Sequence, residues 1–261
     1  MLGFFTDPDH IIAIGLLASL CAGLATAVGA LPIFFTSNIH KKVLDILLGF
    51  AAGIMLAATS FSLIIPAIEA GGGGVKGAAI TLFGILVGGI FLDLIDKFFP
   101  DTNLLGGPAQ NHNNLRRAWI FVLAITVHNF PEGLAVGLGF GSGDINNGFN
   151  LAIAIGLQNI PEGLAVCLPL LREGLKTWKV FLVALISGLV EPIGGLIGVS
   201  LAHSAASVLP FGLAFAAGAM LFVISHEIIP ETQKKVASKA ATHALLMGFV
   251  IMMFLDNVLG A

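Results

Sequence analysis

The sequence predicts an all-α integral membrane protein with eight transmembrane helices. The 261-residue chain is 57% apolar and only 10% charged, whereas a soluble domain carries about 25% charged residues. Eight apolar runs are long enough, at about 20 residues each, to cross a bilayer. Of the 12 Lys and Arg residues, 11 fall in alternate connections between these runs. Because basic residues concentrate in cytoplasmic loops, both termini are predicted to be extracytoplasmic.

The eight runs define the predicted elements in chain order. They lie at 11–34, 43–68, 78–95, 118–141, 150–170, 180–202, 210–229 and 241–259. The third is the shortest, since it ends at Asp93 and Asp96. No basic segment precedes the first run, so we expect the N-terminus to be retained. Residues 1–261 then form a single transmembrane domain, and the polar stretch 97–117 is a flexible cytoplasmic loop within it.

The distribution of basic residues supports the count of eight. The alternate connections hold Lys41, Lys42, Lys97, Arg116, Arg117, Arg172, Lys176, Lys179, Lys234, Lys235 and Lys239. Only Lys76 lies on the other side. Seven or nine spans would mix the two sets. We therefore expect a multi-pass protein of the cell membrane, in contact with the lipid bilayer and with no nucleic-acid partner.

Two internal repeats indicate a symmetric arrangement. Residues 128–136 and 158–166 match at seven of nine positions, and 50–56 resembles 215–221, each of the latter pair preceding an Ile-Ile-Pro. In the predicted topology the members of each pair run in opposite directions. The sequence thus predicts inverted three-helix repeats, spans 1–3 and 6–8, around a central pair, spans 4–5. Inverted repeats with interrupted helices are typical of transporters.

The central pair carries the most polar motif of the apolar runs. His128, Asn129 and Glu132 share one face of a helix, because residues three and four apart are neighbours there. Pro131 and Pro161 each lack an amide hydrogen, so each helix is predicted to be broken with a freed backbone carbonyl beside its polar residues. The second motif repeats the arrangement with Gln158, Asn159 and Glu162.

Three carboxyl groups are predicted inside the hydrocarbon. Glu132, Glu162 and Glu191 each cost about 2.5–3.5 kcal/mol at a helix centre, and no Lys or Arg lies in any run. Either they are neutral and hydrogen-bonded, or a cation completes the site. Imidazole, carboxylate and amide ligands without thiolate suit Zn²⁺, Cd²⁺, Fe²⁺ or Mn²⁺, and two bridging glutamates would allow two metals. Uptake should weaken in acid, because protons compete for the ligands.

The paired HNxPEG and QNxPEG motifs make the chain resemble the ZIP family of metal transporters over nearly its whole length. The resemblance implies inward transport of zinc or related ions, no enzymatic activity and no organic cofactor; it leaves a homodimer open. It also implies a metal site, binuclear in some members. The implied ligands are His128, Asn129, Glu132, Gln158, Asn159, Glu162 and Glu191. Many relatives have His at the position of Gln158, which puts metal preference in question.

Two further groups are candidate auxiliary sites. By family resemblance, the entrance would be lined from the second span by Asp45, Met55, Ser62 and Glu69. A predicted exit or auxiliary site comprises His226, Glu227, Glu231 and Asp256. These residues lie in the seventh and eighth spans.

Two other functions compete with metal transport. An intramembrane metalloprotease needs two His around a Glu at i and i+4, but Pro230 stands where the second His would follow His226. A transporter of protons or of other cations could use the same glutamates. His128 favours a transition metal over that alternative.

Overall fold

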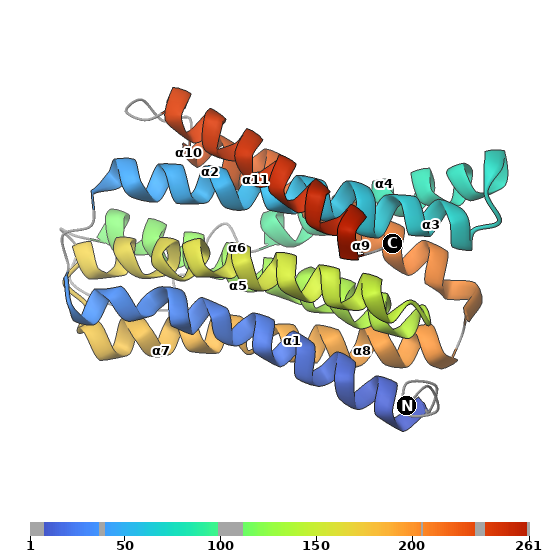
Figure 1. The fold of residues 1–261 in the computed structure, drawn as a ribbon. Coiled ribbons are helices and arrows are strands. Elements are labelled where there is room, and N and C mark those ends of the chain that lie inside the picture. Colours follow the sequence, from blue (N-terminus) through green and yellow to red (C-terminus); the bar gives the residue numbers. More distant parts are fainter. Residues whose placement is uncertain (1–7, 37–39, 99–111, 205, 233–237, 260–261) are drawn as a thin grey trace.

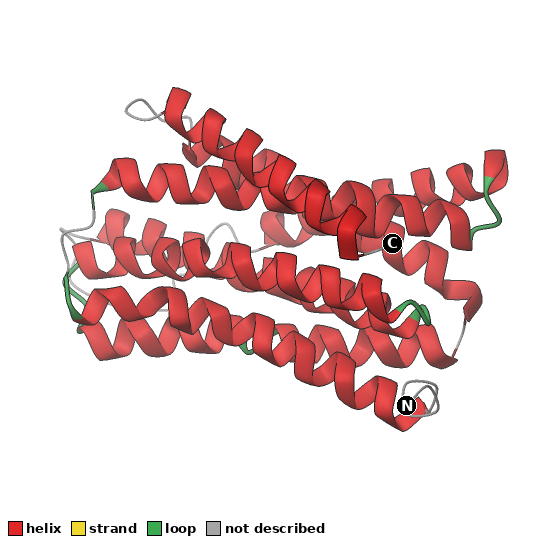
Figure 2. Ribbon diagram, in the orientation of Figure 1, coloured by secondary structure: helices red, strands yellow, loops and turns green. Residues whose placement is uncertain are grey.

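The computed structural model describes residues 8–36, 40–98, 112–204, 206–232 and 238–259. All regular structure in these ranges is helical (Figures 1 and 2). The longer α-helices are α1 Pro8–Ala30, α2 Lys41–Ala58, α4 Gly74–Phe98, α5 His112–Gly141, α6 Ile145–Arg172, α7 Thr177–Gly188, α8 Glu191–Ser204, α9 Leu209–Val223 and α11 Ser238–Leu259. Shorter segments are η2 Leu31–Phe34, η3 Thr59–Ile64, α3 Ile65–Ala70, η4 Ala206–Val208, η5 Ile224–Ile228 and α10 Ile229–Thr232.

Seven helical segments of the described chain are long and apolar enough to cross a membrane. They are His10–Phe34, Lys42–Ala70, Gly74–Ile95, Ile145–Arg172, Thr177–Ala202, Leu209–Thr232 and Lys239–Val258. Each overlaps one of the predicted runs. The remaining run, 118–141, lies within the 30-residue helix α5. The chain is thus an all-helical, multi-pass membrane protein.

The central part of the predicted loop 97–117 lies outside the described residues. Helix α4 continues to Phe98, and α5 begins at His112. Both helices therefore extend into the stretch for which we predicted no regular structure. Low hydropathy marks the end of a membrane run but does not by itself end a helix, which can continue into water.

The helices pack as two bundles, which lie in the lower and upper halves of Figure 1. The first bundle consists of α1, α5, α6, α7 and α8, and the second of α2, α3, α4, α9, α10 and α11. The closest pairs lie within a bundle: α5 with α8 and α1 with α6 in the first, α2 with α11 and α4 with α9 in the second. The bundles meet mainly where α2 packs on α6 and α5 packs on α9.

Glycines allow close approach inside each bundle. A Cβ at Gly133 would overlap the backbone of Glu191 in the first bundle, and one at Gly53 would overlap that of Leu245 in the second. Across the bundles, the only described glycine that a Cβ would bring into contact is Gly212, which would meet the Leu138 side chain. Small residues let membrane helices pack backbone to backbone. The two bundles instead meet through side chains.

Both halves of the chain contain the same helical irregularity. In η3 the amide of Ile65 donates to Ser60, five residues back, and in η5 the amide of Ile229 donates to Ile224. Each π-helical segment immediately precedes or enters the Ile-Ile-Pro that the sequence comparison paired. Single π-helical turns are rare and often occur at functional sites. Their presence at matching places agrees with the predicted relation between spans 2 and 7.

The prediction that α5 and α6 are broken at their prolines is wrong. Both helices continue through Pro131 and Pro161. Proline is tolerated inside membrane helices because neighbouring helices and side chains compensate for the lost hydrogen bond. The interruption lies in the sixth span, where Leu189 and Val190 separate α7 from α8. Pro192, in the first turn of α8, lacks an amide hydrogen and cannot donate to the carbonyl of Gly188, so the sequence does carry a local signal of this break.

Candidate metal site

The two polar motifs face each other in the first bundle. His128, Asn129 and Glu132 come from α5, and all three are almost fully buried, as are Gln158 and Asn159 of α6. The Nε2 of Gln158 donates to Oε1 of Glu132 at 2.5 Å and joins the two helices. Glu162, also buried, lies one turn further along α6. The predicted convergence of the two motifs is therefore present.

The interruption between α7 and α8 brings a third helix to the motifs. Glu191 begins α8 and is fully buried. Its Oε1 accepts from Nδ2 of Asn159 at 2.6 Å, and the same nitrogen donates to the carbonyl of Ala22 at 2.8 Å. Because Gly133 has no side chain, α5 approaches the backbone at Glu191 closely.

Ser187 anchors the first motif to the end of α7, and sequence reasoning missed it. The Nδ2 of Asn129 donates to the Ser187 carbonyl at 2.8 Å and lies 3.2 Å from its hydroxyl. That hydroxyl also contacts the Thr126 hydroxyl at 3.1 Å. The available signal was a serine four residues before Glu191 in an apolar run. Serines are common in membrane helix contacts, so that signal is weak.

These contacts use the side-chain amide nitrogens of Asn129, Gln158 and Asn159 as hydrogen-bond donors. The side-chain amide oxygens of the same three residues have no hydrogen-bond partner within the described ranges. Among the described residues, five buried side-chain oxygens of the motifs and Glu191 have no hydrogen-bond partner. They are Asn129 Oδ1, Glu132 Oε2, Gln158 Oε1, Asn159 Oδ1 and Glu191 Oε2. A buried acceptor without a partner costs about 1–3 kcal/mol. A cation would satisfy several such oxygens at once.

His128 faces a second group of acids. Its Nε2 lies 2.8 Å from Oε1 of Glu227, which η5 contributes from the second bundle. His128, Glu162, Glu227 and Glu231 line a cavity of about 20 Å³. This is about the space of one water molecule or a single ion. Glu227 thus adjoins the central motifs, although we predicted it in a separate exit site.

No three His, Cys, Asp or Glu side chains in the described part of the chain are already arranged to hold a metal ion. Two features account for this. The His128 imidazole contacts Glu227 and not the motif carboxylates. Several of the free oxygens belong to Asn and Gln side chains, which are not among these four residue types. A metal coordinated by His128 together with the motif carboxylates therefore requires a side-chain movement.

Three of the predicted entrance residues are buried, namely Asp45, Met55 and Ser62, and the fourth, Glu69, is exposed. Ser62 donates to Oδ1 of Asp256 at 2.5 Å, and the Ser62 carbonyl accepts from Asn147 of α6. Asp256 therefore lies with Ser62 of the predicted entrance group and not with the other predicted exit residues. Helix α11 packs along α2 so that Asp256, near its C-terminal end, meets the end of the second span that carries Ser62.

His226 is separate from Glu227 despite being its neighbour in sequence. Its side chain is exposed, and its ring stacks on Phe222 with centroids 5.1 Å apart. Consecutive helical residues point about 100° apart. The four residues of the predicted exit group are thus in three places. Glu227 and Glu231 line the cavity, His226 lies outside it, and Asp256 accepts a hydrogen bond from Ser62.

The contact between His128 and Glu227 leads to a first prediction. Glu227→Ala is expected to lower the maximal rate of metal transport about tenfold with a smaller change in KM. The five free oxygens would still take up the ion, but the next carboxylate beyond His128 would be missing. Initial rates in proteoliposomes over a range of zinc concentrations measure both constants. A raised KM with an unchanged maximal rate would instead place Glu227 in the loading site.

Comparison with known proteins identifies the family. The family model described as "ZIP Zinc transporter" matches residues 101–256. The chain is 44% identical to "Zinc transporter GufA" of Myxococcus xanthus, with 94% of this chain and 99% of that protein covered. It is 42% identical to "Zinc transporter ZIPB" of Bordetella bronchiseptica, covering 90% and 78%, and 37% identical to human "Zinc transporter ZIP11", covering 90% and 94%.

The matched region contains both polar motifs and Glu191, and the relatives extend the similarity over most of the chain. The predicted resemblance is thereby confirmed. This chain belongs to the ZIP family of zinc transporters.

Proposed function

We propose that this protein moves Zn²⁺ across the cell membrane into the cytoplasm through the site between α5, α6 and α8. The observation that carries the proposal is the set of five partnerless buried oxygens on three helices that the motif side chains join. The names of the relatives support zinc as the ion. Cd²⁺, Fe²⁺ and Mn²⁺ suit the same ligand chemistry. No step in this function calls for an organic cofactor or for enzymatic chemistry.

The site would hold the ion in two adjacent positions. Glu132, Asn129, Gln158, Asn159 and Glu191 contribute the free oxygens of one position. The cavity lined by His128, Glu162, Glu227 and Glu231 forms the other. His128 and Glu162 belong to the motifs and also line the cavity, so they connect the two positions. This arrangement supports a binuclear site or a two-step passage.

The topology belongs to the same proposal. Seven candidate spans and helix α5 would give eight crossings, with both termini extracytoplasmic as the basic residues predict. The matching π-helical segments support inverted repeats of spans 1–3 and 6–8. In this orientation Ser62 and Asp256 lie toward the outside. The homodimer remains a prediction.

Zinc uptake into proteoliposomes containing a zinc-sensitive dye tests the function. We expect influx above that of empty vesicles, saturating with zinc and inhibited by Cd²⁺. Folded protein that gives no influx at any zinc concentration would refute the proposal. Parallel assays with Fe²⁺ and Mn²⁺ order the metals.

One observation favours the alternative of another cation. While the His128 imidazole contacts Glu227, the remaining atoms that could coordinate an ion are all oxygens. Sites made only of oxygen ligands suit hard cations. A pH-sensitive dye and an alkali-ion dye in the same vesicles distinguish the two functions. Proton or alkali-ion flux without zinc flux would favour the alternative.

Gln158 provides a second prediction, on metal preference. Gln158→His is expected to raise the preference for Zn²⁺ over Mn²⁺ several-fold, because it replaces an amide oxygen with an imidazole nitrogen. Competition of Mn²⁺ with zinc uptake measures the change. The control is Asn257→His, on an exposed position whose side chain donates to the carbonyl of Met253 in its own helix. An equal preference in wild type and Gln158→His would exclude Gln158 from the coordination sphere.

A further inference from the structure

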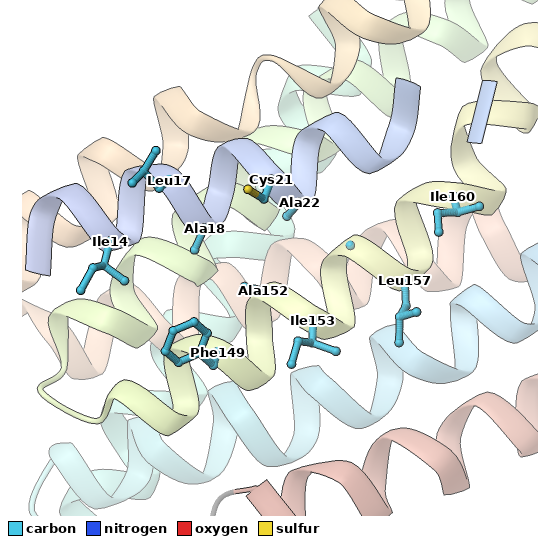
Figure 3. Close-up of a pocket in the computed structure, with 11 residues that line it drawn as sticks. Ile14, Leu17, Ala18, Cys21, Ala22, Phe149, Ala152, Ile153, Leu157 and Ile160 are labelled. Atoms are coloured by element: carbon cyan, nitrogen blue, oxygen red, sulfur yellow. The ribbon is translucent and has the colours of Figure 1, made fainter. Parts of the chain in front are cut away.

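An apolar groove runs along the outer face of the first bundle, between α1 and α6 (Figure 3). Its volume is about 530 Å³. The groove is lined from α1 by Ile14, Leu17, Ala18, Cys21 and Ala22, and from α6 by residues between Phe149 and Ile160. Apart from the Cys21 thiol, every lining side chain is apolar.

Small residues create the groove. Ala18 and Ala22 on α1 lie opposite Ala152 on α6 (Figure 3), and Gly156 lines the same groove. A Cβ at Gly156 would meet only the Cα of Ala22, at 3.8 Å, so the space above this glycine is open. Larger and more exposed side chains, such as Leu17 and Ile153, form the rims. The two helices thus touch along a narrow floor and diverge toward the outside.

The dimensions of the groove decide what fits it. Residues 149–160 rise about 16 Å along α6, which is about the depth of one leaflet of a hydrocarbon core about 30 Å thick. The volume spread over that length gives a mean cross-section of about 32 Å², whereas a helix about 10 Å in diameter needs about 80 Å². A helix of a second copy could enter a groove of this width only with its side chains, whereas one extended hydrocarbon chain, a single methylene across, fits along its whole length.

The position of the groove decides the source of that chain. Its lining residues lie inside the candidate spans His10–Phe34 and Ile145–Arg172. The medium around the groove is therefore the acyl region of the bilayer. The groove itself is lined by apolar side chains, which would not hold a polar ligand. We propose that the groove binds an acyl chain of a membrane phospholipid as a distinct site, separate from general lipid contact.

This site lies directly behind the polar motifs. Ala22, in the groove floor, accepts through its carbonyl from Asn159, and Leu157 and Ile160 of the groove flank Gln158 and Asn159 in sequence. A chain in the groove fills the space between α1 and α6 at the level of the second motif. The bound lipid would thus support the packing on which the position of Asn159 depends.

Photolabelling in proteoliposomes tests the site, with a phosphatidylcholine that carries a diazirine in its acyl chain. Labelling is mapped by mass spectrometry at Leu17, on the rim of the groove, and at Leu82, which is similarly exposed on α4 (59% and 61%). We expect several-fold more label at Leu17. Saturation of the Leu17 signal as the fraction of diazirine lipid rises would mark a site; label at Leu82 should follow that fraction linearly.

A matched pair of substitutions identifies the groove as the cause. Gly156→Leu fills it and should reduce labelling at Leu17 to the level at Leu82. Gly89→Leu adds the same side chain on α4, where a Cβ also meets nothing closer than 3.7 Å, and should change nothing. Equal labelling of Leu17 and Leu82 in the wild type would overturn the proposal. So would cross-linking of Cys21 between two copies in place of lipid labelling, which would show that protein covers the groove.

Discussion

Glu132→Gln is expected to abolish zinc uptake while leaving the protein folded in the membrane. Glutamine has nearly the same shape, and its amide can be accommodated beside Gln158, so the packing of α5 on α6 should survive. The substitution replaces a carboxyl group, which can ionise to bind a cation, with a neutral amide that lies within the free-oxygen set. Residues that only orient a metal ligand cost about 10–100-fold when replaced. Loss of a charged ligand should reduce uptake by at least about a hundredfold.

Glu173→Gln is the control for this experiment. Glu173 follows α6 at its C-terminal end and lies outside both groups that line the proposed path. The Glu173→Gln substitution makes the same change of side chain and should leave uptake unchanged. Size-exclusion chromatography and thermal unfolding in detergent verify that Glu132→Gln is folded. Wild-type uptake in a folded Glu132→Gln protein would show that the ion follows another path.

Gly133→Val is expected to lower both stability and transport, through the backbone. Any Cβ at this position overlaps the carbonyl of Glu191, so α5 and α8 would have to move apart. Overpacking of this kind typically costs about 1–3 kcal/mol. The same displacement would move Glu191 away from Asn159. We expect a lower unfolding temperature, and little zinc uptake even where the protein stays folded.

Gly89→Val provides the comparison for Gly133→Val, since a Cβ there meets only the Gly218 carbonyl at 3.7 Å. This variant should unfold near the wild-type temperature and should transport zinc. If Gly133→Val matched it in both measurements, close approach of α5 to α8 would be irrelevant to the site.

Much of the fold followed from composition, because the bilayer restricts what the chain can do. Acids without basic partners in apolar runs, and basic residues in alternate loops, are patterns that few structures satisfy. The motif residues converged as predicted, since helical spacing places His128, Asn129 and Glu132 on one face. The match of two motifs in sequence also predicted that their helices would lie together.

The errors came from contacts between distant parts of the chain. The two prolines were expected to break α5 and α6, but neighbouring helices compensate for the missing amide, and the break occurs at Leu189 instead. The contacts of His128 with Glu227 and of Ser62 with Asp256 join residues far apart in sequence. No local pattern encodes such pairs, because they depend on which helices pack together.

The distribution of glycine contacts has a mechanical consequence. Helices in contact through their backbones have little freedom to shear against each other, so each bundle should behave as one stiff unit. Interdigitated side chains can exchange rotamers at lower cost. We therefore expect any movement of one bundle relative to the other to occur at the boundary formed by α2 with α6 and by α5 with α9. The hydrogen bond from His128 to Glu227 crosses that boundary. Displacement of one unit along the other would break it and release the imidazole toward the carboxylates of its own unit.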